Sequence, residues 1–107
     1  MRHMEVQCNK LYMEQMIRGF LHVYVGEESV SIGIEAGITK EDCVITAYRD
    51  HCIAVVRGDT SYRIIAENIG KRTGSTEGKG GSMHLYNKKN NYYGGHGIVG
   101  AQVSALK

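Results

Sequence analysis

The chain has 107 residues, which is the size of one small domain, so its length excludes a protein of several complete domains. Its formal net charge of +2 is too small to favour nucleic acid as a partner, and no apolar run is long enough to cross a membrane. The start of the chain is mixed and polar, so neither a signal peptide nor a transit peptide is visible.

Apolar residues in the first part of the chain recur mainly at helical spacing. The spacing predicts helices over about residues 4–18, 27–36, 51–57 and 60–70, and a short apolar run predicts a buried strand over 43–46. Gly19, Gly37 and Gly70 are expected to end three of these helices, because glycine adopts the left-handed conformation that follows a helix C-terminus. Turns are expected over 22–26 and 39–42. The apolar face of the helix predicted over 60–70 is expected to consist of Tyr62, Ile65, Ala66 and Ile69.

Nine of the 14 glycines lie between Gly70 and Gly100, where no periodicity is visible. A long loop without secondary structure is unusual in a compact domain and is typical of a functional loop, or of one that a partner orders. A last helix is expected from Gly100 to Leu106. The sequence therefore predicts a packed first part followed by a long glycine-rich loop region.

Two glycine motifs resemble nucleotide-binding loops. Gly95 to Gly100 match the GxGxxG pattern, but no apolar strand is expected before them and no acidic ribose ligand follows, so a dinucleotide site is disfavoured. Two interpretations stay open for this motif: a tight backbone turn, or a loop whose backbone approaches a ligand closely. Gly78 to His84 lack the spacing of a phosphate loop, and their composition favours a flexible surface loop.

Residues Tyr48 to His51 place a phenol, a guanidinium, a carboxylate and an imidazole side by side. Arg49 suits a phosphate or carboxylate ligand, whereas a solvated helix start with Asp50 near its N-terminus explains the cluster equally well. His22, taken alone, is more often structural. The histidines have no metal-binding spacing, and the three cysteines are interpreted as free thiols of a reducing compartment, so no metal site is predicted.

Four segments together resemble one family, the pyruvate dehydrogenase alpha subunits. They occur in the family's order and spacing and cover nearly the whole chain. Arg18 to Glu28 resemble RGF-H-Y-GQE, Ile45 to His51 resemble ITAYR-H, Gly78 to His84 reproduce GKGGSMH, and Gly94 to Val103 resemble GG-GIVGAQV. Acetoin dehydrogenase alpha subunits are the nearest alternative family.

The resemblance implies an α/β fold, namely the N-terminal part of the thiamin diphosphate-binding fold, which is incomplete and helix-rich with a long glycine-rich loop region. Residues 1–107 would form a partial domain that ends before the family's GDG magnesium motif. The implied activity is the oxidative decarboxylation of pyruvate with transfer of the acetyl group to lipoamide, which gives acetyl-CoA in the complex. The implied partners are the beta subunit and the lipoyl transacetylase, and the implied location is the mitochondrial matrix.

The same resemblance assigns roles to five residues. His22 would face the substrate and cofactor, and Tyr48 and Arg49 would contact the substrate and the cofactor diphosphate. Gly97 and Val99 would offer backbone atoms to the aminopyrimidine ring. No catalytic residue and no magnesium ligand falls in the matching segments, so this chain alone is expected to be inactive.

The chain departs from the family pattern at several positions. Glu27 stands where the family has glutamine, Cys52 replaces a glycine, and Ser104 replaces a proline. Together with the missing GDG segment, these departures leave a rival interpretation: a non-catalytic truncated copy that at most binds the beta subunit.

Overall fold

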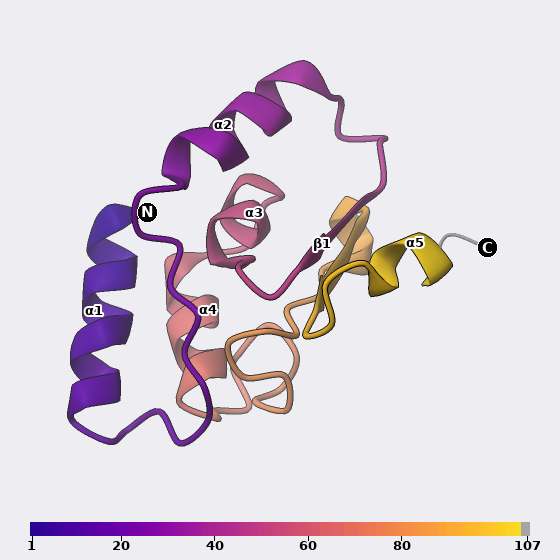
Figure 1. Cartoon of the computed structure of the whole chain (residues 1–107). Coiled ribbons are helices and arrows are strands. Elements are labelled where there is room, and N and C mark those ends of the chain that lie inside the picture. Colours follow the sequence, from indigo (N-terminus) through magenta and orange to yellow (C-terminus); the bar gives the residue numbers. More distant parts are fainter. Residues whose placement is uncertain (106–107) are drawn as a thin grey trace.

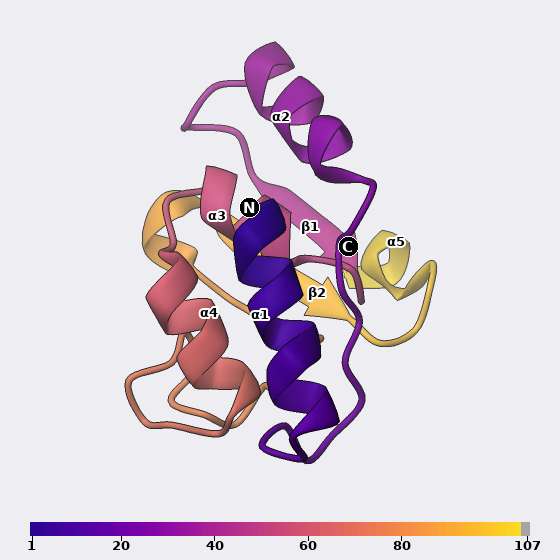
Figure 2. The same ribbon diagram turned by 90° about the vertical axis from the view of Figure 1, so that its left-hand side faces the viewer.

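The computed structural model describes residues 1–105, which fold into short helices around a two-stranded sheet (Figure 1). In chain order the elements are α1 (Arg2–Met13), α2 (Glu28–Gly37), β1 (Val44–Ala47), α3 (His51–Val56), α4 (Ser61–Asn68), the 3-10 turn η1 (Lys88–Asn90), β2 (Tyr92–His96) and α5 (Ala101–Ala105). Helix α1 packs on α4, and α2 packs on α3 (Figure 2). None of the helices in residues 1–105 has the length and apolar character needed to span a membrane.

The two strands are parallel, and β2 lies where a loop is expected from the sequence. Val44 pairs with Tyr92 and Thr46 with Gly95, so β2 carries one extra residue in a bulge between these pairs. The prediction of an unstructured region from Gly70 to Gly100 is therefore wrong for β2 and η1, although most of residues 71–87 is irregular. The same finding corrects the expectation that no strand leads into the GxGxxG motif, because β2 includes its first two residues.

Glycine hides β2 from pattern-based prediction, and the packing explains why glycine is there. A Cβ at Gly94 would lie 2.1 Å from the ring of Tyr86, and one at Gly95 would lie 2.2 Å from Asp50 Oδ2. The strand therefore approaches its neighbours too closely for any side chain. Without alternating apolar side chains at these positions, the period of two that marks a strand is lost.

Helix α1 ends five residues earlier than predicted. The N–H of Met16 bonds to the carbonyl of Leu11, and the N–H of Gln15 bonds to the carbonyl of Tyr12. These bonds form a Schellman motif in which Gln15 takes the left-handed conformation, with φ of 59°. A glutamine in this position gives no sequence signal, so the spacing continued the helix to the next glycine.

The predictions for α2, α3 and the turn before β1 are confirmed, except that Gly37 is the last residue of α2 and does not take the left-handed conformation. Asp42 accepts hydrogen bonds from the N–H and the hydroxyl of Thr39, as expected of a capping-like turn over 39–42. Strand β1 is shifted by one residue from its predicted bounds and is half-buried rather than fully buried. The expected last helix is α5, and Leu106 lies outside the described residues.

Helix α4 is present, but its predicted apolar face is only partly correct. Thr60 caps the helix by accepting a hydrogen bond from the N–H of Arg63 at 3.2 Å. Tyr62 is 67% exposed, while Ile64 is fully buried. The buried face of α4 therefore differs from the predicted one, because two polar residues, Glu67 and Asn68, also face the interior.

The core lies between α1, α3, α4 and β2. Its buried residues are Met4, Cys8, Ile17, Tyr24, Cys52, Ile53, Ala54, Ile64, Leu85 and Tyr92. Burial raises the pKa of Cys8 to about 11 and that of Cys52 to about 12, so both thiols stay protonated and pack as small apolar groups.

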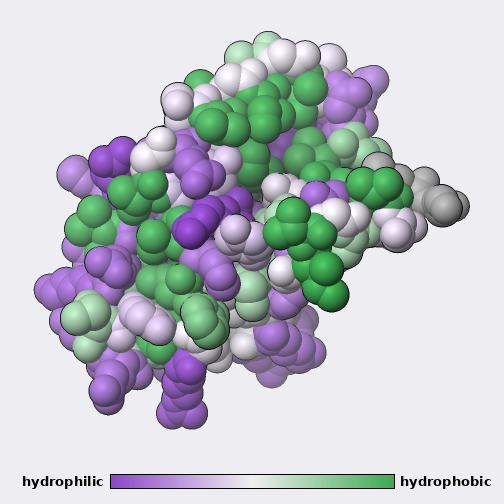
Figure 3. All heavy atoms as spheres, in the orientation of Figure 1, coloured by the Kyte–Doolittle hydropathy of each residue, from purple (hydrophilic) through white to green (hydrophobic). Residues whose placement is uncertain are grey.

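Apolar side chains also remain exposed over two parts of the surface. Val30, Ile32 and Ile34 on α2 are about half exposed. Ile98 and Val99, which lead into α5, are at least 70% exposed. Figure 3 shows apolar atoms gathered over α2 and near the C-terminal end of the described chain. These two apolar surfaces flank the candidate site.

Candidate functional site

A pocket of about 330 Å³ lies between α2, the C-terminal end of β1 and the loop that precedes α5. Apolar residues from three segments and the charged pair of Arg49 and Glu27 form its walls. The lining residues are Tyr24, Glu27, Val30, Ile34, Thr46, Ala47, Tyr48, Arg49, Ile53 and Val99. The pocket therefore collects Tyr48, Arg49 and Val99 from two sequence motifs about fifty residues apart.

Three of the predicted site residues contact one another at the edge of this pocket. The rings of His22 and Tyr48 have centroids 4.7 Å apart, and the Arg49 guanidinium carbon lies 5.6 Å from the centroid of the Tyr48 ring. Arg49 also donates a hydrogen bond to the carbonyl of Val23 and lies 3.9 Å from a carboxylate oxygen of Glu27. These contacts fix a cation and a phenol side by side at the mouth of the pocket.

The imidazole of His22 is half-buried, and its surroundings favour the neutral form. Burial, together with the nearby Arg49 and His51, lowers the pKa of His22. Its Nδ1 has no hydrogen-bond partner within residues 1–105. This nitrogen is itself buried, so it is a polar atom left without a hydrogen bond beside the pocket.

Gly97 is near this arrangement but does not line the pocket. Its position is exposed, and a Cβ there would meet His84 Cε1 at 3.8 Å and Met83 Sδ at 3.9 Å. The structure thus brings His22, Tyr48, Arg49 and Val99 together, and places Gly97 on the same loop as Val99, two residues earlier.

A buried network of hydrogen-bonded polar groups supports the backbone of His22. Ser82 Oγ accepts a hydrogen bond from the backbone N–H of His22 at 2.9 Å and lies 2.9 Å from His51 Nε2. His51 Nδ1 lies 3.0 Å from Glu5 Oε1. If the proton of the His51 ring is on Nδ1, that N–H donates a hydrogen bond to Glu5. Nε2 then accepts a hydrogen bond from the Ser82 hydroxyl, so His51 and Ser82 both have their hydrogen bonds satisfied.

The connectivity of these groups is that of a serine–histidine–acid triad, but their burial is that of a structural network. Ser82 is only 4% exposed, and Glu5 and His51 are fully buried. A nucleophilic serine must reach the substrate, and this hydroxyl is already engaged on both sides. The network therefore holds the backbone of His22 in place.

Asp50 is also buried, which corrects the alternative of a solvated helix start. Its Oδ2 accepts a hydrogen bond from the Tyr92 hydroxyl at 3.1 Å, while Oδ1 has no partner within residues 1–105. Burial raises the pKa of Asp50 to about 7. This carboxyl connects the start of α3 to β2.

Gly78 to His84 are not the flexible surface loop that their composition favours. Ser82 is buried, and His84 Nδ1 lies 3.1 Å from the carbonyl oxygen of Gly95. The supporting residues Glu5 and Ser82 are absent from the sequence-predicted site. Ser82 lies inside the GKGGSMH motif, so the motif carries a signal for it, whereas nothing in the local sequence singles out Glu5.

The structure is a small mixed helix and strand segment with a short parallel sheet, in which a cation and aromatic side chains lie beside one pocket. Comparison with known families assigns this segment to one of them. The family described as "Dehydrogenase E1 component" matches residues 1–107, so the chain belongs to that family.

Curated relatives carry a consistent name. "Pyruvate dehydrogenase E1 component subunit alpha, mitochondrial" from Pisum sativum is 58% identical over 103 residues, which are 96% of this chain and 26% of the relative. The protein of the same name from Sminthopsis macroura is 53% identical over 102 residues, which are 95% of this chain and 28% of the relative. The chain therefore spans about a quarter of the length of these relatives.

Proposed function

We propose that this chain supplies the substrate- and cofactor-facing segment of a mitochondrial pyruvate dehydrogenase alpha subunit. Its work is the oxidative decarboxylation of pyruvate with acetyl transfer to lipoamide, in a complex with a beta subunit and the lipoyl transacetylase. The observation that supports this proposal is the convergence of Tyr48, Arg49 and Val99 on one pocket, with the His22 ring against Tyr48.

The residues around the pocket fit thiamin diphosphate as the cofactor. Arg49 provides the positive charge that a diphosphate or a carboxylate needs. Val30, Ile34 and Val99 provide apolar surface for a ring, and Gly97, two residues before Val99, has no side chain to cover its backbone. When bound, thiamin diphosphate supplies the carbanion stabilisation that decarboxylation of a 2-oxo acid requires.

Each side chain then has a defined task. Arg49 binds the anionic group, and Tyr48 holds Arg49 in position while offering its hydroxyl to the ligand. His22, kept neutral by its surroundings, faces the substrate and cofactor and binds the substrate. The buried network behind Ser82 keeps His22 from moving away from Tyr48.

We assign the magnesium ligands to the GDG motif of the family, on the resemblance described above. The family's GDG motif is not among these 107 residues, so we propose that the segment alone does not decarboxylate pyruvate.

A chimera tests this proposal in the context of a complete subunit. Residues 1–107 replace the matching segment of the Pisum sativum relative, and the chimera is expressed with a pyruvate dehydrogenase beta subunit. We expect thiamin-dependent turnover of pyruvate, and an increase of at least about tenfold in the KM for thiamin diphosphate when Arg49 is changed to Met. Arg63→Met, which removes an exposed arginine of α4, is the matched control.

The outcomes separate the candidate functions. Turnover of acetoin in preference to pyruvate would transfer the proposal to the acetoin dehydrogenases. A chimera that binds the beta subunit but turns over neither substrate would support the non-catalytic alternative.

A further inference from the structure

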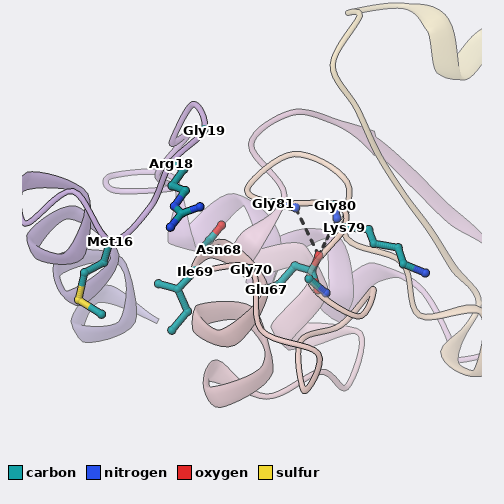
Figure 4. Close-up of a pocket in the computed structure, with 11 residues that line it drawn as sticks. Met16, Arg18, Gly19, Glu67, Asn68, Ile69, Gly70, Lys79, Gly80 and Gly81 are labelled. Carbon is teal, nitrogen blue, oxygen red and sulfur yellow. Dashed lines mark hydrogen bonds between the residues drawn. The ribbon is translucent and has the colours of Figure 1, made fainter.

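One buried carboxylate organises the glycine-rich loop between α4 and β2. Glu67, on the last turn of α4, is fully buried. Its Oε2 accepts hydrogen bonds from the N–H groups of Thr76 at 2.8 Å and Gly78 at 2.9 Å. Its Oε1 accepts from the N–H groups of Gly80 at 2.6 Å and Gly81 at 3.3 Å, and from the Thr76 hydroxyl at 2.6 Å. Figure 4 shows the amides of Gly80 and Gly81 pointing at this carboxylate.

The glycine spacing of the loop follows from this wrapping. A Cβ at Gly80 would lie 2.1 Å from the carbonyl oxygen of His84, and a Cβ at Gly78 would lie 2.6 Å from the backbone of Gly70. A Cβ at Gly74 would lie 2.3 Å from Glu67 Oε2. A loop of convergent amides on glycines is an anion-binding nest, and here the protein's own side chain fills it.

The electrostatic balance at Glu67 agrees with this geometry. Burial by itself opposes the ionised form, but the hydrogen bonds from Thr76, Gly78 and Gly80 outweigh it and lower the pKa of Glu67. The carboxylate is therefore ionised at neutral pH, as an occupant of an anion nest must be.

The far end of the same loop contacts the candidate site from two directions. Ser82 holds the backbone N–H of His22, and His84 contacts the carbonyl of Gly95 in β2. Gly81, which Glu67 binds, is followed directly by Ser82, and only two residues separate it from His84. A change in the shape of the loop therefore reaches both His22 and the strand that leads to Val99.

We propose that Glu67 is a positioning residue: its carboxylate fills an anion nest in the loop 74–81 and, through Ser82 and His84, fixes His22 and β2. This role holds whichever 2-oxo acid or other ligand the pocket binds, because it depends only on contacts within the chain.

Amide hydrogen exchange in the full chain tests the proposal with a matched pair of variants. Glu67→Gln keeps the shape but removes the charge and replaces one acceptor oxygen by a donor. Glu77→Gln makes the same change on an exposed glutamate of the same loop, whose ion pair is with Lys79. In Glu67→Gln we expect exchange at Gly78, Gly80 and the His22 amide to accelerate roughly ten- to hundredfold. Glu77→Gln should leave all of them unchanged.

The distinguishing site is the amide of Arg57, which bonds to the Ile53 carbonyl at 2.9 Å at the end of α3, a helix outside both the loop and β2. Acceleration at Arg57 equal to that at Gly80 would mean that Glu67 only supports global stability, and would overturn the proposal. Unchanged exchange at His22 would overturn the link from the loop to the site.

Chemical rescue provides a second measurement if Glu67→Gln does not fold. Glu67→Ala empties the nest, so formate should restore amide protection at Gly78 and Gly80, whereas the neutral isostere formamide should not. Recovery with formate alone would support an anion nest. Equal recovery with both additives, or recovery with neither, would contradict it.

Discussion

Glu67 and Asp50 are both fully buried carboxylates, yet their surroundings drive them in opposite directions. The loop after α4 gives Glu67 five hydrogen-bond donors, and its pKa falls below the ordinary value. At the start of α3, Asp50 accepts one side-chain hydrogen bond, from the hydroxyl of Tyr92 on β2, and burial raises its pKa to about 7. The balance between desolvation and hydrogen bonding decides which form of each group is stable: the donors outweigh desolvation at Glu67, and desolvation outweighs them at Asp50.

The two groups therefore link stability to pH with opposite sign. The stabilisation from Glu67 is present above its unfolded pKa of 4.5 and is lost as the pH falls through its lowered folded value. Asp50 behaves in the reverse way. Its contribution is present below its unfolded pKa of 3.8 and is lost as the pH rises through about 7. At neutral pH, Glu67 therefore stabilises the loop, whereas the ionisation of Asp50 destabilises the contact between α3 and β2.

Arg57 extends the comparison to a buried cation, and its removal should have the largest effect. Its side chain is fully buried and donates to the carbonyls of Thr39, Asp42 and Asn90 at 2.7–3.0 Å, and to a carboxylate oxygen of Glu35 at 3.3 Å. Arg57→Met would remove all of these hydrogen bonds and the buried charge that joins α3 to the turn before β1, so we expect the free energy of unfolding to fall by about 3–5 kcal/mol. Urea denaturation followed by circular dichroism measures this change.

The control for Arg57 is Arg63, whose side chain is 45% exposed and pairs with Asp59 at 3.6 Å. Arg63→Met should lower the free energy of unfolding by less than about 1 kcal/mol. Equal effects of the two substitutions would show that the satisfied buried charge is not what holds α3 to the turn before β1.

Asp50→Asn should produce the next largest effect, and it should be stabilising at high pH. Asparagine mimics the neutral carboxyl and does not titrate, so the variant loses the penalty that ionisation of Asp50 imposes. Between pH 4 and pH 8 we expect the wild type to lose about 2–4 kcal/mol of unfolding free energy relative to the variant. Denaturation at several pH values measures this difference, and parallel curves for the two proteins would contradict the assignment.

The approach of β2 to Asp50 can be broken from the other side. A Cβ at Gly95 would lie 2.2 Å from Asp50 Oδ2 and 2.5 Å from the carbonyl oxygen of Met83. Gly95→Ala should therefore destabilise the chain by about 1–3 kcal/mol, as overpacking does. Gly97→Ala, where the nearest atom would be 3.8 Å away, should change thermal stability little. A similar loss of stability in both variants would mean that glycine is needed here for flexibility and not for close approach.

Local signals in the sequence were enough to predict α2, α3 and the turn from Thr39 to Asp42. Each of these depends on neighbouring residues, such as a cap or an apolar spacing. The end of α1 and the existence of β2 could not be predicted in this way. Gln15 takes a conformation that glycine usually marks, and β2 is defined by its pairing with β1 across nearly fifty residues.

The candidate site divides along the same line. His22, Tyr48, Arg49 and Val99 lie in motifs, and the structure brings them together around one pocket. Glu5 and Glu67 support the site through buried hydrogen bonds. In the sequence each is a single acidic residue on a helix, which is typical of a solvated surface position. Their role depends on donors that arrive from distant parts of the chain, so no local pattern reveals them.

The substitution of Glu27 should have the smallest effect. Unlike Glu67, this carboxylate stabilises no loop, and it lowers the affinity of the nearby Arg49 for an anionic ligand. Glu27 stands where the pyruvate dehydrogenase alpha pattern has glutamine, and its oxygen lies 3.9 Å from Arg49 Nε. Both side chains are about half exposed, so their interaction is weak and Glu27→Gln should leave stability unchanged. The freed guanidinium should bind thiamin diphosphate or inorganic pyrophosphate about two- to fivefold more tightly, as measured by NMR titration.

Glu14→Gln is the matched control for this measurement. Glu14 pairs with Lys10 at the same 3.9 Å and has a similar exposure, but it lies at the C-terminal end of α1, outside the pocket lining. If both variants gain the same affinity, the effect is one of net charge, and Glu27 has no particular hold on Arg49.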